Sequence, residues 1–225
     1  MSTDQAIELV QAELAAAADP EKAAPMAAYM KTDMPFYGVQ KKGRTPIVRR
    51  LTNQFPPADR ASYENTVLGL WGLPHREEKY VAIAYARSFD TWVDAASLPL
   101  FRRLIVEGAW WDLVDETAIK LVGRALLEDR NTVEGIIRPW IGDTDLWLRR
   151  TSLICQIGHK SATDTEFLAD ACSSNLGDSD FFIRKGIGWA LREYARTDPS
   201  WVRGYVATHR EDMAGLSIRE ATKHL

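Results

Sequence analysis

Cysteine is scarce in this sequence. The 225 residues include only two cysteines, Cys155 and Cys172, and these form no C-x-x-C pair. Two cysteines in a chain of this length exclude a disulfide scaffold. Both are therefore interpreted as small buried hydrophobes in a reducing compartment, and we expect a cytoplasmic protein.

Long apolar runs are missing as well. No stretch approaches the roughly 18 to 20 apolar residues that a membrane span needs, and the acidic, amphipathic start MSTDQAIELV does not resemble a signal or transit peptide. The composition, 46% hydrophobic and 26% charged, is typical of a globular protein. We expect a soluble protein with no membrane partner.

Familiar catalytic motifs are also absent. The sequence has no G-x-S-x-G, no phosphate-binding glycine loop and no H-E-x-x-H. Its four histidines are scattered without metal-ligand spacing, and the GIG at 186–188 is interpreted as close helix packing. We therefore expect no metal and no nucleotide cofactor.

Positive charge is segregated rather than absent. The net charge is −3, yet residues 41–60 carry six Lys or Arg against one Asp, and residues 181–225 carry eight against five acids. A charge cluster is usually a solvated face, so this distribution by itself is a weak indication of an anionic partner.

Apolar residues recur at spacings of three and four throughout, which predicts an all-α protein. Connections are short and no flexible linker divides the chain, so we expect one domain over residues 1–225. The expected helices lie near 4–17, 21–31, 46–55, 58–71, 75–88, 97–106, 111–127, 132–141, 146–158, 164–174, 181–196, 199–210 and 217–224.

Capping signals support several of these helix starts. Thr45 before Pro46 is typical of an N-cap followed by a proline at the first helical position. Ser217 and Glu220 have capping-box spacing. Asp180 and the Asp198-Pro199 pair each precede a long amphipathic run.

One motif repeats at a fixed distance. DTDLWLRR at 143–150 matches DSDFFIRK at 178–185, an offset of 35 residues, and one further step back gives the aromatic-rich GAWWDLVD at 108–115. A period of 35 is the length of one helix pair in an α-solenoid. Chance similarity between two helix starts is the alternative, and the eight-residue match favours the repeat.

In a solenoid, equivalent residues of successive repeats point the same way. The register therefore places Asp115, Arg150 and Lys185 in one row. Flanking positions carry large apolar side chains: Trp111, Leu146 and Phe181 on one side, and Ile119, Ile154 and Trp189 on the other. Helical spacing puts Trp111 on the face of Asp115, and Lys185 and Arg192 on the face of Trp189. A charged row edged with tryptophan indicates a binding surface.

Simpler interpretations hold for other residues. Asp112, in the first turn of a helix, is explained by the helix dipole. Arg149 and Arg150 are adjacent, so only one of them can lie in the row. Five tryptophans are expected in the core or between repeats: Trp71, Trp92, Trp140, Trp147 and Trp201.

Several segments together resemble the AlkD-like DNA alkylation repair glycosylases. These segments are YMKTDMPFYGVQ (29–40), WWDLVD (110–115), DLWLRRTSL (145–153), DFFIRKGIGWALREYARTDP (180–199) and LSIREATKHL (216–225). The resemblance runs from about Tyr29 to the C-terminus. It implies HEAT-like repeats curled into a C-shaped solenoid whose concave face binds duplex DNA.

The resemblance also implies an activity, the excision of cationic N3- and N7-alkylated purines by a monomeric enzyme that does not flip the base into a pocket. Matched motif to motif, the catalytic cluster falls on Asp115, Trp111 and Trp189. The arginine near the phosphates falls on Arg150, with Arg192 a further candidate, and Tyr29 and Gln40 match positions that approach DNA. From the row itself we add Lys185 and Phe181 as DNA contacts.

Two other functions stay open from the sequence. One is a catalytically silent relative that binds unusual DNA structures, although the intact Trp/Asp cluster disfavours it. The other is a protein-binding helical scaffold, the usual role of helical solenoids.

Overall fold

The chain folds into helices throughout the part that the structure describes. The structure, a computed structural model, describes residues 2–225, and this range contains no strand. The all-α expectation is therefore confirmed. Across the same residues, no helix combines the length and the hydropathy that crossing a membrane would require.

The residues separate into two compact units, Met1–Trp92 and Val93–Leu225. The first unit contains α1 (Thr3–Ala16), α2 (Pro20–Met30), α3 (Lys41–Gln54), α4 (Arg60–Trp71) and α5 (Arg76–Ala86), followed by the 3₁₀ turn η1 (Asp90–Trp92). The expectations of one continuous repeat domain and of a concave face stay predictions.

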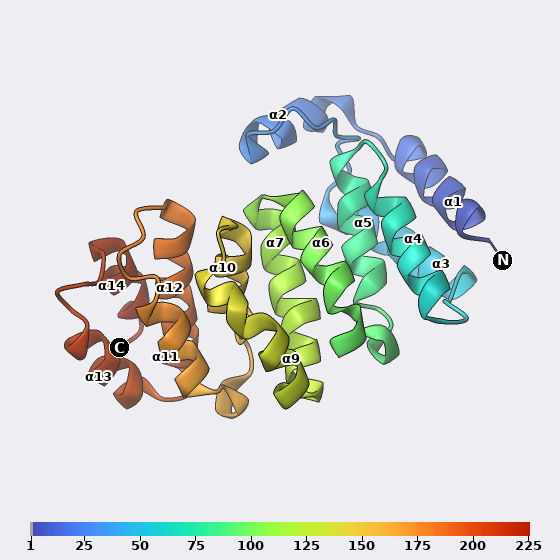
Figure 1. The fold of residues 1–225 in the computed structure, drawn as a ribbon. Helices are drawn as coiled ribbons and strands as arrows, with labels where there is room; N and C mark the ends of the chain where they lie inside the picture. The colour runs from blue at the N-terminus through green and yellow to red at the C-terminus, as the bar shows by residue number, and fades with distance from the viewer. Residues whose placement is uncertain (1) are drawn as a thin grey trace. The chain divides into compact units, whose positions relative to one another are not determined.

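The second unit carries the repeated motif. Its elements are η2 (Ala95–Ser97), α6 (Leu98–Gly108), α7 (Trp111–Thr117), η3 (Ala118–Val122), α8 (Gly123–Glu128), α9 (Arg130–Ile137), η4 (Arg138–Gly142), α10 (Leu146–Ile154), η5 (Lys160–Ala162), α11 (Thr165–Ser173), α12 (Phe181–Tyr194), α13 (Pro199–Thr208) and α14 (Gly215–Ala221). Within this unit α7, α10, α12 and α14 follow one another as neighbours, with α9, α11 and α13 in a second row beneath them (Figure 1).

The 35-residue period is visible in the local contacts. Asp145 caps α10 by accepting the backbone N–H of Trp147 at 2.8 Å, and Asp180 caps α12 by accepting that of Phe182 at 2.6 Å. One arginine in each motif also donates to the backbone carbonyl six residues earlier in the chain. Arg149 donates to the carbonyl of Asp143 at 2.8 Å and Arg184 donates to that of Asp178 at 2.9 Å. Because the two motifs form the same capping structure, the helical repeat is confirmed in this unit.

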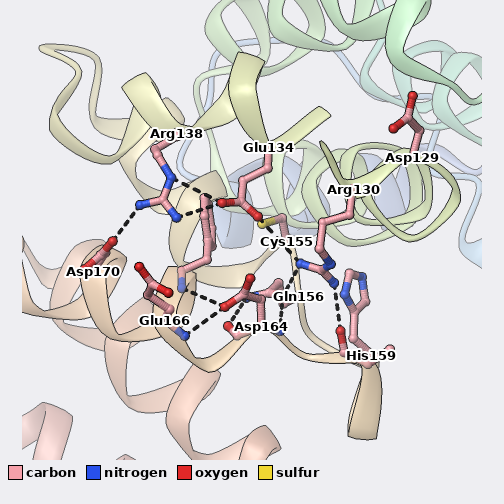
Figure 2. Close-up of polar contacts among 12 residues, drawn as sticks. Asp129, Arg130, Glu134, Arg138, Cys155, Gln156, His159, Asp164, Glu166 and Asp170 are labelled. Atoms are coloured by element: carbon pink, nitrogen blue, oxygen red, sulfur yellow. Dashed lines mark hydrogen bonds and ion pairs between the residues drawn. The ribbon is translucent and has the colours of Figure 1, made fainter. Parts of the chain in front are cut away.

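Polar contacts join the helices of the second row. The Arg138 guanidinium donates to Glu134 at 2.7 Å, one helical turn away, and to Asp170 of α11 at 2.6 Å (Figure 2). Arg130 donates to the side chain of Gln156 at 3.2 Å and to the carbonyl of Ala162 at 2.7 Å. These contacts fix η4 against α11 and α9 against the α10–α11 connection.

Two of the capping predictions are confirmed, because Asp180 and Asp198 are side-chain N-caps of α12 and α13. Two others are wrong. α3 begins at Lys41, so Pro46 lies inside it and the Thr45 hydroxyl donates to the Lys41 carbonyl. α14 begins at Gly215, so Ser217 lies inside that helix and donates its hydroxyl to the carbonyl of Arg184 at 2.9 Å.

A π-helical segment, η3, interrupts the helix expected over 111–127. It separates α7 from α8, which begins at Gly123. A Cβ added at Gly123 would lie 2.2 Å from the Cys155 carbonyl oxygen, so only glycine permits this close approach. The extra residue per turn of a π segment changes which face the next turn presents. Asp115, before the π segment, pairs with Arg150 of α10, and Gly123, after it, lies against the Cys155 carbonyl at the end of α10.

Both cysteines are buried and free, as expected. Burial raises the pKa of the Cys155 thiol and that of the Cys172 thiol to about 12, so both stay protonated near neutral pH. Of the five tryptophans expected in the core, Trp71, Trp140 and Trp147 are buried, whereas Trp92 and Trp201 are half-buried.

We predict that Gly123→Ala lowers the free energy of unfolding by about 1–3 kcal/mol, because the added methyl group must push α8 away from the Cys155 backbone. Urea unfolding followed by far-UV circular dichroism measures this change. Gly135→Ala is the matched control. Nothing lies within 4 Å of a Cβ at Gly135, so alanine there should stabilise α9 by up to about 1 kcal/mol. Equal effects of the two variants would refute the close-approach argument.

Candidate functional site

The centre of the candidate site is an ion pair between Asp115 and Arg150. Arg150 Nε donates to Asp115 Oδ1 at 2.7 Å, and Arg150 Nη2 donates to Asp115 Oδ2 at 2.8 Å. Two parallel bonds of this kind fix both the position and the plane of a carboxylate. The Arg150 side chain is 4% exposed and that of Asp115 is 15% exposed, so the carboxylate keeps the access to solvent that the guanidinium lacks.

Arg150 is itself held from behind by α12. Its Nη1 donates to the Phe182 carbonyl oxygen at 2.6 Å. Gly186 lies beside it, since a Cβ there would stand 3.5 Å from Nη1. Three of the five N–H groups of the guanidinium are thus engaged within the protein. Arg150 is therefore a buried partner that orients the Asp115 carboxylate, and its expected contact with phosphates stays a prediction.

Burial raises the pKa of Asp115 above its ordinary value of 3.8. The hydrogen bonds and the charge of Arg150 act in the opposite direction, and the nearby charge of Asp112 adds to the increase. The net direction is upward, so Asp115 gains a proton at a higher pH than an exposed aspartate.

Aromatic rings surround this ion pair. The Arg150 guanidinium carbon lies 6.0 Å from the centre of the Trp189 ring and 5.8 Å from that of Phe182. The structure therefore brings Asp115, Arg150 and Trp189 together, as the period predicts. Trp111 is half-buried at the start of α7, one helical turn before Asp115.

A second aromatic cluster joins the start of α7 to α10 and α12. The centre of the Trp110 indole lies 5.3 Å from the centre of the Phe182 ring and 6.1 Å from that of Trp147. Phe181, at the exposed start of α12, contacts Phe182 edge to face at 5.4 Å. Trp110 also has a buried indole N–H without a hydrogen-bond partner. Sequence reasoning assigned Trp110 no role, although its place beside Trp111 was a usable signal.

A tight turn sets the direction of α7. Ala109, which ends α6, has a φ of 39°, in the left-handed region that L-residues rarely adopt. Trp110 then returns to extended geometry and α7 starts at Trp111. This turn leaves Asp115 one helical turn into α7, where its side chain meets α10.

Lys185 and Arg192 share a carboxylate from the last helix. Lys185 Nζ lies 2.7 Å from Glu220 Oε1, and Arg192 Nη1 contacts Glu220 Oε2. Both cations have an acidic partner within the chain, and their expected contact with DNA stays a prediction. Lys185 lowers the pKa of Glu220 most, through its hydrogen bond, so Glu220 is ionised at neutral pH.

The row at 35-residue spacing therefore has four members, Asp115, Arg150, Lys185 and Glu220. Their charges run negative, positive, positive, negative and form two ion pairs. Each pair joins neighbouring helices, α7 with α10 and α12 with α14. Sequence reasoning placed Glu220 in a capping box and missed it as a row member. One more step of 35 from Lys185 would have found it.

Tyr29 and Gln40 belong to the first unit. Tyr29 is 71% exposed near the end of α2, and Gln40 is an exposed N-cap of α3 that makes no side-chain capping bond. The segment before Gln40 is held by a buried carboxylate that the sequence did not reveal. Glu77 accepts the backbone N–H groups of Tyr37, Gly38 and Val39 at 2.9–3.1 Å.

Comparison with known proteins points to one family. The pattern of the family described as DNA alkylation repair enzyme matches residues 10–225. A solved structure described as a predicted DNA alkylation repair enzyme from Enterococcus faecalis superposes with a TM-score of 0.86 at 28% sequence identity, covering 92% of this chain and 96% of that one. No curated protein matches the sequence. With nearly its whole length matched, the chain belongs to the DNA alkylation repair enzyme family.

Proposed function

We propose that this protein is a DNA glycosylase that excises cationic N3- and N7-alkylated purines, such as 7-methylguanine and 3-methyladenine, from duplex DNA. The observation that carries the proposal is the Asp115 carboxylate in a member of a DNA alkylation repair family: a buried arginine, which itself lies against Trp189, orients it. The enzyme is expected to act as a monomer and to use no cofactor.

The chemistry follows from the charge of the lesion. An N3- or N7-alkylated purine is already cationic, so it leaves with the electrons of the N-glycosidic bond as a neutral base and needs no general acid. The deoxyribose meanwhile acquires oxocarbenium character at C1′. A preorganised negative charge near that sugar stabilises the transition state more than the ground state, and this difference accelerates the reaction.

Asp115 has the capacity for this role. An ionised carboxylate offers about four acceptor positions, and the two bonds from Arg150 occupy two of them. The remaining positions can accept a hydrogen bond from the water that attacks C1′. That water adds its oxygen to the sugar and loses a proton, which leaves an abasic site.

The aromatic and basic residues of the row complete the proposed site. The indole faces of Trp111 and Trp189 attract the cationic nucleotide through cation–π contact and stacking. Lys185 and Arg192 contact the flanking phosphates, which makes the affinity depend on salt. In the first unit, Tyr29 and Gln40 are the proposed further DNA contacts, with Phe181 at the start of α12. The enzyme approaches the sugar and the backbone and does not draw the base into a pocket.

Asp115→Asn should lower the single-turnover rate of 7-methylguanine release by about 100-fold or more, because the amide keeps the shape and loses the charge that stabilises the sugar. Affinity for the duplex should stay within a few-fold. The released base is identified by chromatography, and a melting curve checks the fold because the variant leaves Arg150 without an anionic partner.

Glu116→Gln is the control for that experiment, since it removes one acidic charge from the next position of α7 and should leave the rate nearly unchanged. Undiminished release by Asp115→Asn would remove Asp115 from the mechanism. Absence of release by the unmodified protein, with DNA binding retained, would favour a catalytically silent DNA-binding relative. Absence of both would favour a protein-binding scaffold.

The rate of base release should fall with acidity at a higher pH than an ordinary aspartate would give. Burial raises the pKa of Asp115 above 3.8, and protonation removes the catalytic charge, so activity is full above the raised pKa and is lost as pH falls through it. Single-turnover rates across acidic pH test this on 7-methylguanine, whose charge is permanent. The residual activity of Asp115→Asn should lack this acidic limb, and an acidic limb of equal position in both proteins would contradict the assignment.

A further inference from the structure

The Glu220 carboxylate pairs with Lys185 and Arg192, the two cations that are proposed to bind DNA phosphates. We propose that Glu220 is an internal mimic of a DNA phosphate, which holds Lys185 and Arg192 when DNA is absent and competes with a backbone phosphate for them. The inference rests on the proposed function, since it requires that this row of the second unit faces DNA. It adds a residue that sets affinity from outside the reacting centre.

The geometry of α12 places these cations beside the candidate catalytic residues. Lys185, Trp189 and Arg192 are separated by four and three residues, so they lie on one face of the helix. Trp189 faces Arg150, which in turn holds Asp115. Because the three residues share one face, a strand whose sugar meets Asp115 has its neighbouring phosphates near Lys185 and Arg192.

The backbone that carries Glu220 is fixed against α12. A Cβ added at Gly188 would lie 2.4 Å from the Cβ of Glu220 and 3.0 Å from the Ser217 carbonyl oxygen, so α14 lies directly on the glycine surface of α12. The Ser217 hydroxyl reinforces this contact through its bond to the Arg184 carbonyl. Packing therefore fixes the stem of Glu220, and only the carboxylate end needs to move when a phosphate replaces it.

The charges match those of a phosphodiester. Each Glu220 oxygen contacts one cation, Oε1 with Lys185 and Oε2 with Arg192, which is the arrangement that two phosphate oxygens would adopt. The side chains are partly exposed, 37% for Lys185 and 20% for Arg192, so an incoming anion can reach them. A carboxylate and a phosphodiester both carry one negative charge, hence they exclude each other from this position.

The Asp115–Arg150 pair is a contrasting case within the same row. There the cation is buried and has a second anchor at the Phe182 carbonyl, so an incoming phosphate has less access to it than to Lys185 or Arg192. The Glu220 carboxylate is about as exposed as that of Asp115, at 16%, but its cations are far more exposed than Arg150. Ion pairs with exposed partners contribute little and exchange more readily.

The test is the affinity of Glu220→Gln for a short, fluorescently labelled, unmodified duplex, measured by anisotropy over a range of salt concentrations. The amide keeps the stem that packs on Gly188 and removes the competing charge. We expect affinity to rise about tenfold at low salt, and the plot of log affinity against log salt to steepen by about one unit, because one more phosphate is neutralised.

Glu193→Gln is the matched control. Glu193 follows Arg192 on α12 and pairs with Arg196 at 3.5 Å. The substitution therefore removes the same charge as Glu220→Gln without releasing Lys185. Its affinity and salt slope should change less than twofold. An equal gain in both variants would mean that net charge alone is responsible, which overturns the proposal.

A double-mutant cycle with Lys185→Gln completes the test. Lys185→Gln should weaken binding, and Glu220→Gln should gain markedly less affinity in that background than alone. Fully additive effects would show that the two residues do not act on one phosphate. If the amide variant does not fold, Glu220→Met, which has similar length and no charge, replaces it.

The outcomes separate this inference from the proposed function. If the unmodified protein releases methylated bases and Glu220→Gln folds but binds DNA no more tightly, the inference alone fails and Glu220 only joins α12 to α14. If Glu220→Gln binds more tightly and neither protein releases a base, the glycosylase proposal alone fails. If neither protein binds DNA in a salt-dependent way, both fail.

Discussion

The buried fork between Asp115 and Arg150 is the interaction on which the candidate site depends. Taking two charges out of water is costly unless the geometry is good and the remaining polar atoms are satisfied. Here the guanidinium meets that condition through two bonds to Asp115 and a third to the Phe182 carbonyl. The fork joins α7, α10 and α12, so the carboxylate is placed correctly only when these three neighbouring helices pack correctly. Repeat packing and site geometry are therefore one constraint.

The same spacing is used for two different purposes along the row. Asp115–Arg150 is closed and buried, which suits a charge that must stay in one orientation through a reaction. Lys185–Glu220 is open and partly solvated, which suits contacts that must exchange with a mobile, charged polymer. Glycine makes both possible, because Gly186 leaves room beside the Arg150 guanidinium and Gly188 admits α14 against α12. A side chain at Gly188 would separate α12 from α14, because its Cβ would lie 2.4 Å from the Cβ of Glu220.

Much of this arrangement could be predicted because it follows from periodicity. The match between residues 143–150 and 178–185 predicted that Asp115, Arg150 and Trp189 come together, and the contacts of Arg150 with both residues agree. Local signals were weaker guides. Thr45 and Ser217 have the chemistry of N-caps, yet both lie inside helices, where tertiary contacts and an earlier helix start decide how their hydroxyls are used. Trp110 was missed for the same reason, since its role depends on Phe182 and Trp147 from distant repeats.

The sequence by itself determined the helical class, the 35-residue repeat and the membership of one charged row, because hydrophobic spacing and repeated motifs are local properties of the chain. Only the tertiary structure decided which charges pair. It showed that Arg150 is a buried support for Asp115 and that Lys185 and Arg192 share Glu220. The physical reason is that pairing, burial and pKa depend on the distances between helices and on access to water, and a single sequence carries neither quantity explicitly.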